Sequence, residues 1–92
     1  MDAEQRRKWV DEFCDMDSSI LFADGLDDAL IGVCHRFGQQ TIAAYDYNKC
    51  IEIFIRNGMT HGEAVDWFDY NVIGAYVGET TPCFITMIED DE

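Results

Sequence analysis

The sequence predicts an α+β domain: a small, mainly antiparallel sheet of about three strands packed with a helical hairpin, plus an N-terminal helix. Two helix patterns with clear start and stop signals lie in mid-chain, two short apolar segments precede them, and another follows. With 92 residues, one hydrophobic core and a single domain are expected. Within it we expect an acidic helix over 1–18, an α+β core over 19–88 and an acidic tail over 89–92.

The first predicted helix covers residues 3–16. Trp9, Phe13 and Met16 recur at helical spacing and form one apolar stripe. A second stripe is mostly acidic, and its side chains recur at intervals of three or four residues; neighbours four residues apart lie ~6 Å apart along the axis. Its members are Glu4, Lys8, Asp11 and Asp15.

Two extended segments follow, "ALIGVCHRF" at 29–37 and "TIAAY" at 41–45, joined by "GQQ". The glycine and the short polar link favour a hairpin, so we expect adjacent antiparallel strands. Gly32 lies inside the first segment, where glycine indicates a bulge or the close approach of another backbone.

The central pair of helices carries the strongest local signals. Asp46 precedes an apolar 3.6-residue pattern that ends at Arg56, Asn57 and Gly58, residues that favour a helix end. Thr60 and Glu63 form a capping box that starts the next helix. Because only Gly58 and Met59 separate the two patterns, a tight helical hairpin is predicted.

The stretch "NVIGAYVGETTPCF" at 71–84 is predicted to be a structural joint rather than an active site. Two glycines and a proline oppose a continuous helix, at roughly 1 kcal/mol per glycine and 3 for the proline. "PCFITMI" then has the length and β-branched content of a strand, and proline at its start suits a sheet edge. The joint residues are Asn71, Gly74, Gly78 and Pro82.

The formal net charge of −13 is the main global feature. Such a surface repels nucleic acid and anionic membranes and attracts basic surfaces, so no direct nucleic-acid or membrane contact is expected. Solubility alone is the alternative explanation of the charge. If the acidic face is functional, the expected partner-binding carboxylates are Glu4, Asp11, Asp15, Asp17, Asp24, Asp27 and Asp28.

Two aromatic residues complete the candidate partner-binding set. Helical geometry places Trp67 and Tyr70 on one face beside Glu63, about 100° from the stripe of Ala64 and Phe68. Exposed Tyr and Trp often anchor protein interfaces, so this face is a second candidate rim.

Catalytic and metal-binding patterns are not found. Cys34 and His35 are neighbours in a predicted strand and point to opposite faces, which disfavours a thiol–base pair. The four cysteines include no C-x-x-C pair, and no ligand pair has zinc-site spacing. We therefore expect no metal, no cofactor and no enzymatic activity, in a reducing, cytoplasmic setting.

Residues 45–85 resemble a set of small proteins found largely in phages and prophages. The shared features are Tyr-Asp before a helix, a Gly-Met turn, a Glu-Ala helix start, and Asn-x-x-Gly-Ala-aromatic-Val-Gly-Glu before Thr-Pro. The resemblance implies a family and no particular activity. Together with the charge, the small size and the missing catalytic patterns, it leads us to expect a non-catalytic inhibitor whose acidic surface docks on a basic surface of a host nucleic-acid-handling or defence complex, by analogy with anti-CRISPR and anti-restriction proteins. The alternative is a small structural module that self-associates as a homodimer, and an enzyme ranks third.

Overall fold

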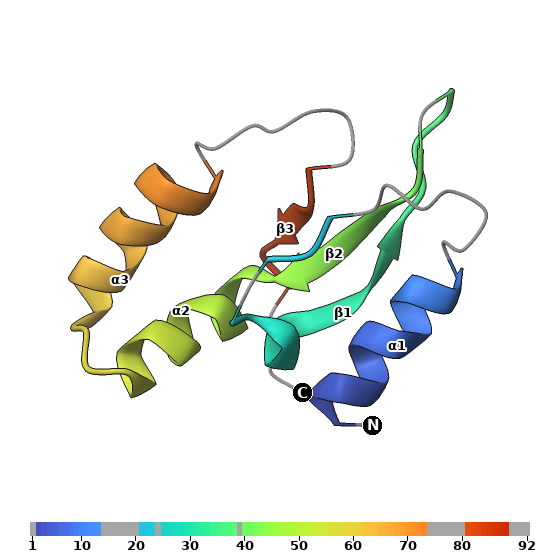
Figure 1. Cartoon of the computed structure of the whole chain (residues 1–92). Helices are drawn as coiled ribbons and strands as arrows, with labels where there is room; N and C mark the ends of the chain where they lie inside the picture. The colour runs from blue at the N-terminus through green and yellow to red at the C-terminus, as the bar shows by residue number, and fades with distance from the viewer. Residues whose placement is uncertain (1, 14–20, 24, 39, 74–80, 89–92) are drawn as a thin grey trace.

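The computed structural model describes residues 2–13, 21–23, 25–38, 40–73 and 81–88 (Figure 1). Within these residues, α1 is followed by a 3₁₀ turn, a hairpin of two strands, the helices α2 and α3, a π-helical turn and a third strand. The elements are α1 (Ala3–Phe13), η1 (Asp27–Ala29), β1 (Leu30–Cys34), β2 (Ile42–Asp46), α2 (Tyr47–Arg56), α3 (His61–Phe68), η2 (Asp69–Ile73) and β3 (Cys83–Ile85). This confirms the predicted α+β class.

The three strands form one sheet in the order β1-β2-β3. β1 and β2 pair antiparallel at four positions, from Leu30 opposite Tyr45 to Cys34 opposite Ile42. The register shifts between Leu30 and Gly32, and Gly32 has a φ of +154°, so the predicted bulge is confirmed.

β3 pairs parallel to β2 at three positions, a direction that the sequence analysis did not specify. The chain leaves β2 through Asp46, passes along α2 and back along α3, and so re-enters the sheet in the original direction. Parallel neighbours need such a crossover, and here two helices supply it. Pro82 directly precedes β3, which is an edge strand as predicted.

The predicted helix caps are all present. The Asp46 carboxylate accepts a hydrogen bond from the Lys49 amide at 3.2 Å. Thr60 Oγ1 accepts from the Glu63 amide at 3.2 Å, while Glu63 Oε1 accepts from the Thr60 amide at 2.9 Å, which completes the capping box. Gly58 has a φ of +109°, a value that residues with a Cβ rarely adopt, and it ends the segment after α2.

The core lies where β2, α2 and α3 meet. Tyr45, Cys50, Ala64 and Phe68 are fully buried. Phe68 contacts three other rings, those of Tyr47, Phe54 and Phe84, at centroid distances of 5.3, 5.9 and 4.9 Å. One side chain of α3 therefore joins α2 and β3 in a single aromatic cluster.

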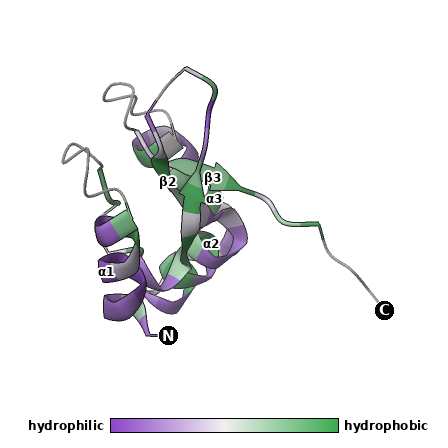
Figure 2. Cartoon of the chain, turned by 90° about the vertical axis from the view of Figure 1, so that its right-hand side faces the viewer, coloured by the Kyte–Doolittle hydropathy of each residue, from purple (hydrophilic) through white to green (hydrophobic). Residues whose placement is uncertain are grey.

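α1 lies along β1, away from the α2–α3 hairpin (Figures 1 and 2). The apolar stripe predicted on this helix is not its packing face: Trp9 is 45% exposed and Phe13 50%, whereas Val10 is buried. The helix is held instead by Val10 and by two arginines on the same side. The guanidinium of Arg6 donates to the Leu30 carbonyl at 2.9 Å, and that of Arg7 lies 4.6 Å from the centre of the Phe22 ring. Met16 is outside the described residues.

Part of the predicted joint can be placed. The Asn71 side-chain amide donates to the Trp67 carbonyl at 3.0 Å, within the turn where α3 gives way to the π-helical η2. This bond gives a backbone carbonyl near the end of α3 a side-chain donor. Gly74 and Gly78 lie outside the described residues.

Candidate partner-binding site

The acidic residues predicted as a docking face on and after α1 differ in their exposure and in their charged neighbours. Glu4 and Asp11 are exposed, and together with Asp27 they border one open depression along α1. Arg7 and Lys8 border the same depression, which makes its charge mixed. Asp15, Asp17 and Asp24 lie outside the described residues.

Asp27 and Asp28 are both paired with arginines. Arg7 Nη1 lies 3.5 Å from Asp27 Oδ2, and Arg56 Nη2 lies 3.8 Å from Asp28 Oδ2. The other oxygen of Asp27 is shielded from solvent. The negative charge of Asp27 is therefore largely neutralised before a partner arrives. To bind a partner's cation, Asp28 would have to give up its ion pair with Arg56.

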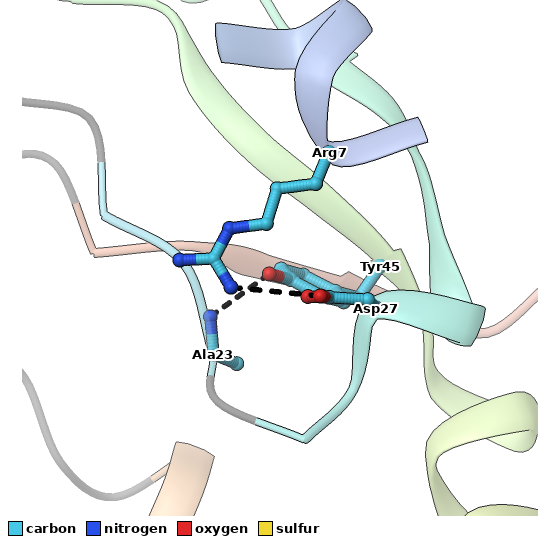
Figure 3. A network of polar contacts seen from close by, with 4 residues as sticks. All are labelled: Arg7, Ala23, Asp27 and Tyr45. Carbon is cyan, nitrogen blue, oxygen red and sulfur yellow. Dashed lines mark hydrogen bonds and ion pairs between the residues drawn. The ribbon is translucent and has the colours of Figure 1, made fainter. Parts of the chain in front are cut away.

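Figure 3 shows how the Asp27 pair forms part of a network around Tyr45. The Ala23 amide donates to the Tyr45 hydroxyl at 2.8 Å, beside the Arg7–Asp27 pair. Burial raises the pKa of Tyr45 to about 12, despite the smaller opposing effect of the hydrogen bond from Ala23. This network connects α1, Ala23, Asp27 and β2. The charges of Arg7 and Asp27 therefore stabilise the contact between these segments.

The raised pKa values of Tyr45, Cys50 and Cys83 predict that the free energy of unfolding falls at alkaline pH. Burial raises the pKa of Cys50 to about 12 and that of Cys83 to about 11, from ordinary values near 8.5. In the unfolded chain these thiols and Tyr45 lose their protons first, so the folded state is favoured below about pH 8.5 to 10 and loses that advantage as pH rises towards 12. We expect far-ultraviolet circular dichroism to fall together with late tyrosine ionisation. A Tyr45→Phe variant should lose less stability above pH 10 than a Tyr70→Phe control. Full tyrosine ionisation in a chain that keeps its dichroism would contradict this.

The outer face of α3, defined here as Glu63, Asp66, Trp67 and Tyr70, presents two carboxylates and two aromatic rings to solvent. All four residues are exposed, with Trp67 at 42% and Tyr70 at 87%. Glu63, Asp66 and Trp67 follow one another at i, i+3 and i+4, which places them on one side of α3, and Tyr70 follows in the π-helical η2. Trp67 and Tyr70 are thus both exposed near acidic groups, and their use as a partner-binding rim stays a prediction.

The residues of this face are held by local contacts. The carboxylate of Glu63 accepts a hydrogen bond from the Thr60 amide, and hydrogen bonds from the backbone and side chain of Thr60 lower the pKa of this carboxylate. The ring of Trp67 lies 4.9 Å from that of Phe54, centroid to centroid. Asp69, at the side of this face, accepts a hydrogen bond from the Tyr47 hydroxyl at 3.3 Å.

A charge asymmetry in the sequence marks this part of the chain and was missed in the sequence analysis. After Arg56 there is no Lys or Arg, while eight Asp and Glu follow. All six Lys and Arg lie between residues 6 and 56, where arginines pair with the acidic residues predicted as the docking face. The sign of each charge along the chain, and not only the total charge, therefore distinguishes α3, which has no Lys or Arg, from α1, which has three.

A second exposed apolar patch lies between α1 and β1. The rings of Trp9 and Phe13 stack at a centroid distance of 5.3 Å, and Ile31 beside them is 41% exposed. A small pocket of about 190 Å³ opens here, bordered by Trp9, Ile31 and Gly32. His35 contacts the edge of the Phe13 ring at 5.8 Å.

Two of the described thiols, Cys50 and Cys83, have pKa values that disfavour the thiolate. The raised pKa values of Cys50 and Cys83 keep both thiols protonated near neutral pH, the opposite of an activated nucleophile. No group of three or more His, Cys, Asp or Glu among these residues could hold a metal ion. In the same part of the chain, no helix has the length and apolar character needed to cross a membrane.

Comparison of the chain with protein-family models, with curated proteins and with solved structures finds no match. Any functional conclusion therefore depends on the residues of this chain.

Proposed function

We propose that this protein is a non-catalytic binding protein that docks on a basic protein surface of a host nucleic-acid-handling or defence complex and inhibits it. The outer face of α3 carries the proposal. Its carboxylates and aromatic rings are exposed on a capped helix, in a part of the sequence without Lys or Arg. Such a surface can pair with arginine both through carboxylates and through ring faces.

Charge gives this proposal its direction. A surface with a net charge of −13 attracts the same basic grooves that bind nucleic acid, and it steers association from a distance. The acidic residues of α1 would contribute to this long-range attraction, while the outer face of α3 supplies the contact. By analogy with anti-CRISPR and anti-restriction proteins, the inhibitor would act in the host cytoplasm; the resemblance to small phage and prophage proteins supports a phage-type protein and not a particular activity.

The proposal is tested by capturing host proteins on the tagged chain at low and at raised salt. We expect a basic nucleic-acid-binding protein that is released as salt rises, because exposed charge interactions are screened. The purified partner should then bind either its nucleic acid or this protein, in direct competition. The proposal would be contradicted by a partner that binds nucleic acid and this protein at the same time, and whose affinity for this protein does not change with salt concentration.

A self-associating structural module is the second candidate, and the patch of Trp9, Phe13 and Ile31 favours it. These side chains are exposed next to β1, an edge strand of the sheet. Two copies carry the same large negative charge, so a homodimer should become tighter as salt rises. Sedimentation at low and high salt separates the candidates, because binding to a basic partner changes in the opposite direction.

A further inference from the structure

An apolar pocket of about 340 Å³ lies beside the outer face of α3. Its walls come from four parts of the chain: residues 21–23 with Leu26, α2, α3 with η2, and residues 81–84. Aromatic and aliphatic side chains predominate among them, notably Phe22, Leu26, Phe54, Trp67, Val72 and Phe84. The volume is at the lower end of the ~300–1,000 Å³ typical of ligand pockets, so it suits one large side chain better than a cofactor.

Trp67 belongs both to the pocket and to the outer face of α3. Its ring lines the pocket against Phe54, yet 42% of the residue remains exposed. The Asn71 amide, at the same rim, is held by its bond to the Trp67 carbonyl. If a partner's side chain enters the pocket past Trp67, the residues that flank it in the partner lie close to α3, which carries Glu63 and Asp66.

We infer that this pocket receives a large apolar side chain, aromatic or long aliphatic, of a partner segment whose flanking residues are Arg or Lys. The inference rests on the proposed function and specifies the chemistry of the partner. Charge complementarity selects this occupant: Glu63 and Asp66, which precede Trp67 on α3 by one turn and by one residue, are exposed carboxylates that favour cations beside the anchor. Arg7, whose guanidinium lies over the Phe22 ring at another wall of the pocket, is already paired with Asp27. A second copy of this acidic chain is disfavoured by like-charge repulsion. Anchors of this kind commonly supply most of an interface's binding energy.

Three capped tripeptides test the inference on the intact protein: Arg-Phe-Arg, Arg-Ala-Arg and Glu-Phe-Glu. Two-dimensional amide NMR would follow the indole N–H of Trp67, the side-chain amide of Asn71 and the backbone of Val72. We expect Arg-Phe-Arg to shift all three signals and to bind at least about tenfold more tightly than either control, because an anchor residue is worth over 1.4 kcal/mol. A Trp67→Ala variant, altered at a partly exposed position, should abolish this preference.

The outcomes separate the inference from the proposed function. If Arg-Ala-Arg binds as tightly as Arg-Phe-Arg, the acidic surface binds cations without an anchor; the pocket inference is then overturned and the proposed function stands. Equal binding of Glu-Phe-Glu and Arg-Phe-Arg would show an apolar site without charge selection, which overturns both. Absence of binding by all three peptides also overturns the inference. The peptide series requires no variant, so a misfolded Trp67→Ala protein would not prevent a decision.

Discussion

Replacement of Phe68 by alanine is expected to lower the free energy of unfolding by about 3–5 kcal/mol, as for other buried phenylalanines. The side chain is fully buried, and its ring contacts those of Tyr47, Phe54 and Phe84. Truncation removes this apolar burial and leaves a cavity between α2, α3 and β3, which close packing on all sides prevents from collapsing completely. Urea unfolding followed by circular dichroism measures the loss.

The control for Phe68→Ala is Tyr70→Ala, two residues further along. Tyr70 is 87% exposed, so its truncation should change stability by no more than about 0.5 kcal/mol. The free energy of unfolding of a domain is usually about 5–15 kcal/mol, so the loss expected for Phe68→Ala is a large part of it. Phe68→Leu retains most of the volume and provides a folded variant with a smaller loss. Equal stability of the Phe68→Ala and Tyr70→Ala proteins would show that the aromatic cluster is not the core.

Features fixed by local chemistry could be predicted from the sequence. The Asp46 cap, the capping box of Thr60 and Glu63 and the glycine that ends α2 each depend on residues within one or two turns. The antiparallel hairpin and its bulge at Gly32 follow likewise from a short link and one glycine. In these segments local preferences and the final fold agree.

Features decided by distant contacts could not be predicted in this way. Helical spacing cannot show that α1 packs through Val10 and its arginines while Trp9 and Phe13 stay half exposed, because that choice depends on the Leu30 carbonyl and on Phe22. Acidic residues at regular spacing on α1, with others after it, likewise suggested a docking face, yet Asp27 and Asp28 have arginine partners. The parallel direction of β3 follows from the path of two helices, which no single segment contains.

Charge reversal in and beside the outer face of α3 is expected to have the largest effect on partner binding. The double variant Asp66→Lys, Asp69→Lys changes one residue of that face and the first residue of η2. It should slow association with the basic partner by about tenfold or more and flatten its dependence on salt. Both residues are exposed, and no Lys or Arg follows Arg56 to neutralise them. The fold should persist, because exposed charges contribute about 0–1 kcal/mol each, and the Tyr47–Asp69 contact is a long one at 3.3 Å. Stopped-flow or surface binding measurements over a range of salt concentrations give the rates.

The matched control reverses two exposed carboxylates on α1, Glu4→Lys and Asp11→Lys, and changes the net charge by the same amount. Glu4 and Asp11 lie beside Arg7 and Lys8, where the local field is already mixed. We expect this variant to slow association less than the α3 variant, since a contact at α3 senses α1 only at long range and through screening salt. Equal slowing by both would mean that total charge, with no organised face, governs binding. Stronger slowing by the α1 variant would move the docking surface to α1, and an effect of neither would leave the negative charge with a role in solubility alone.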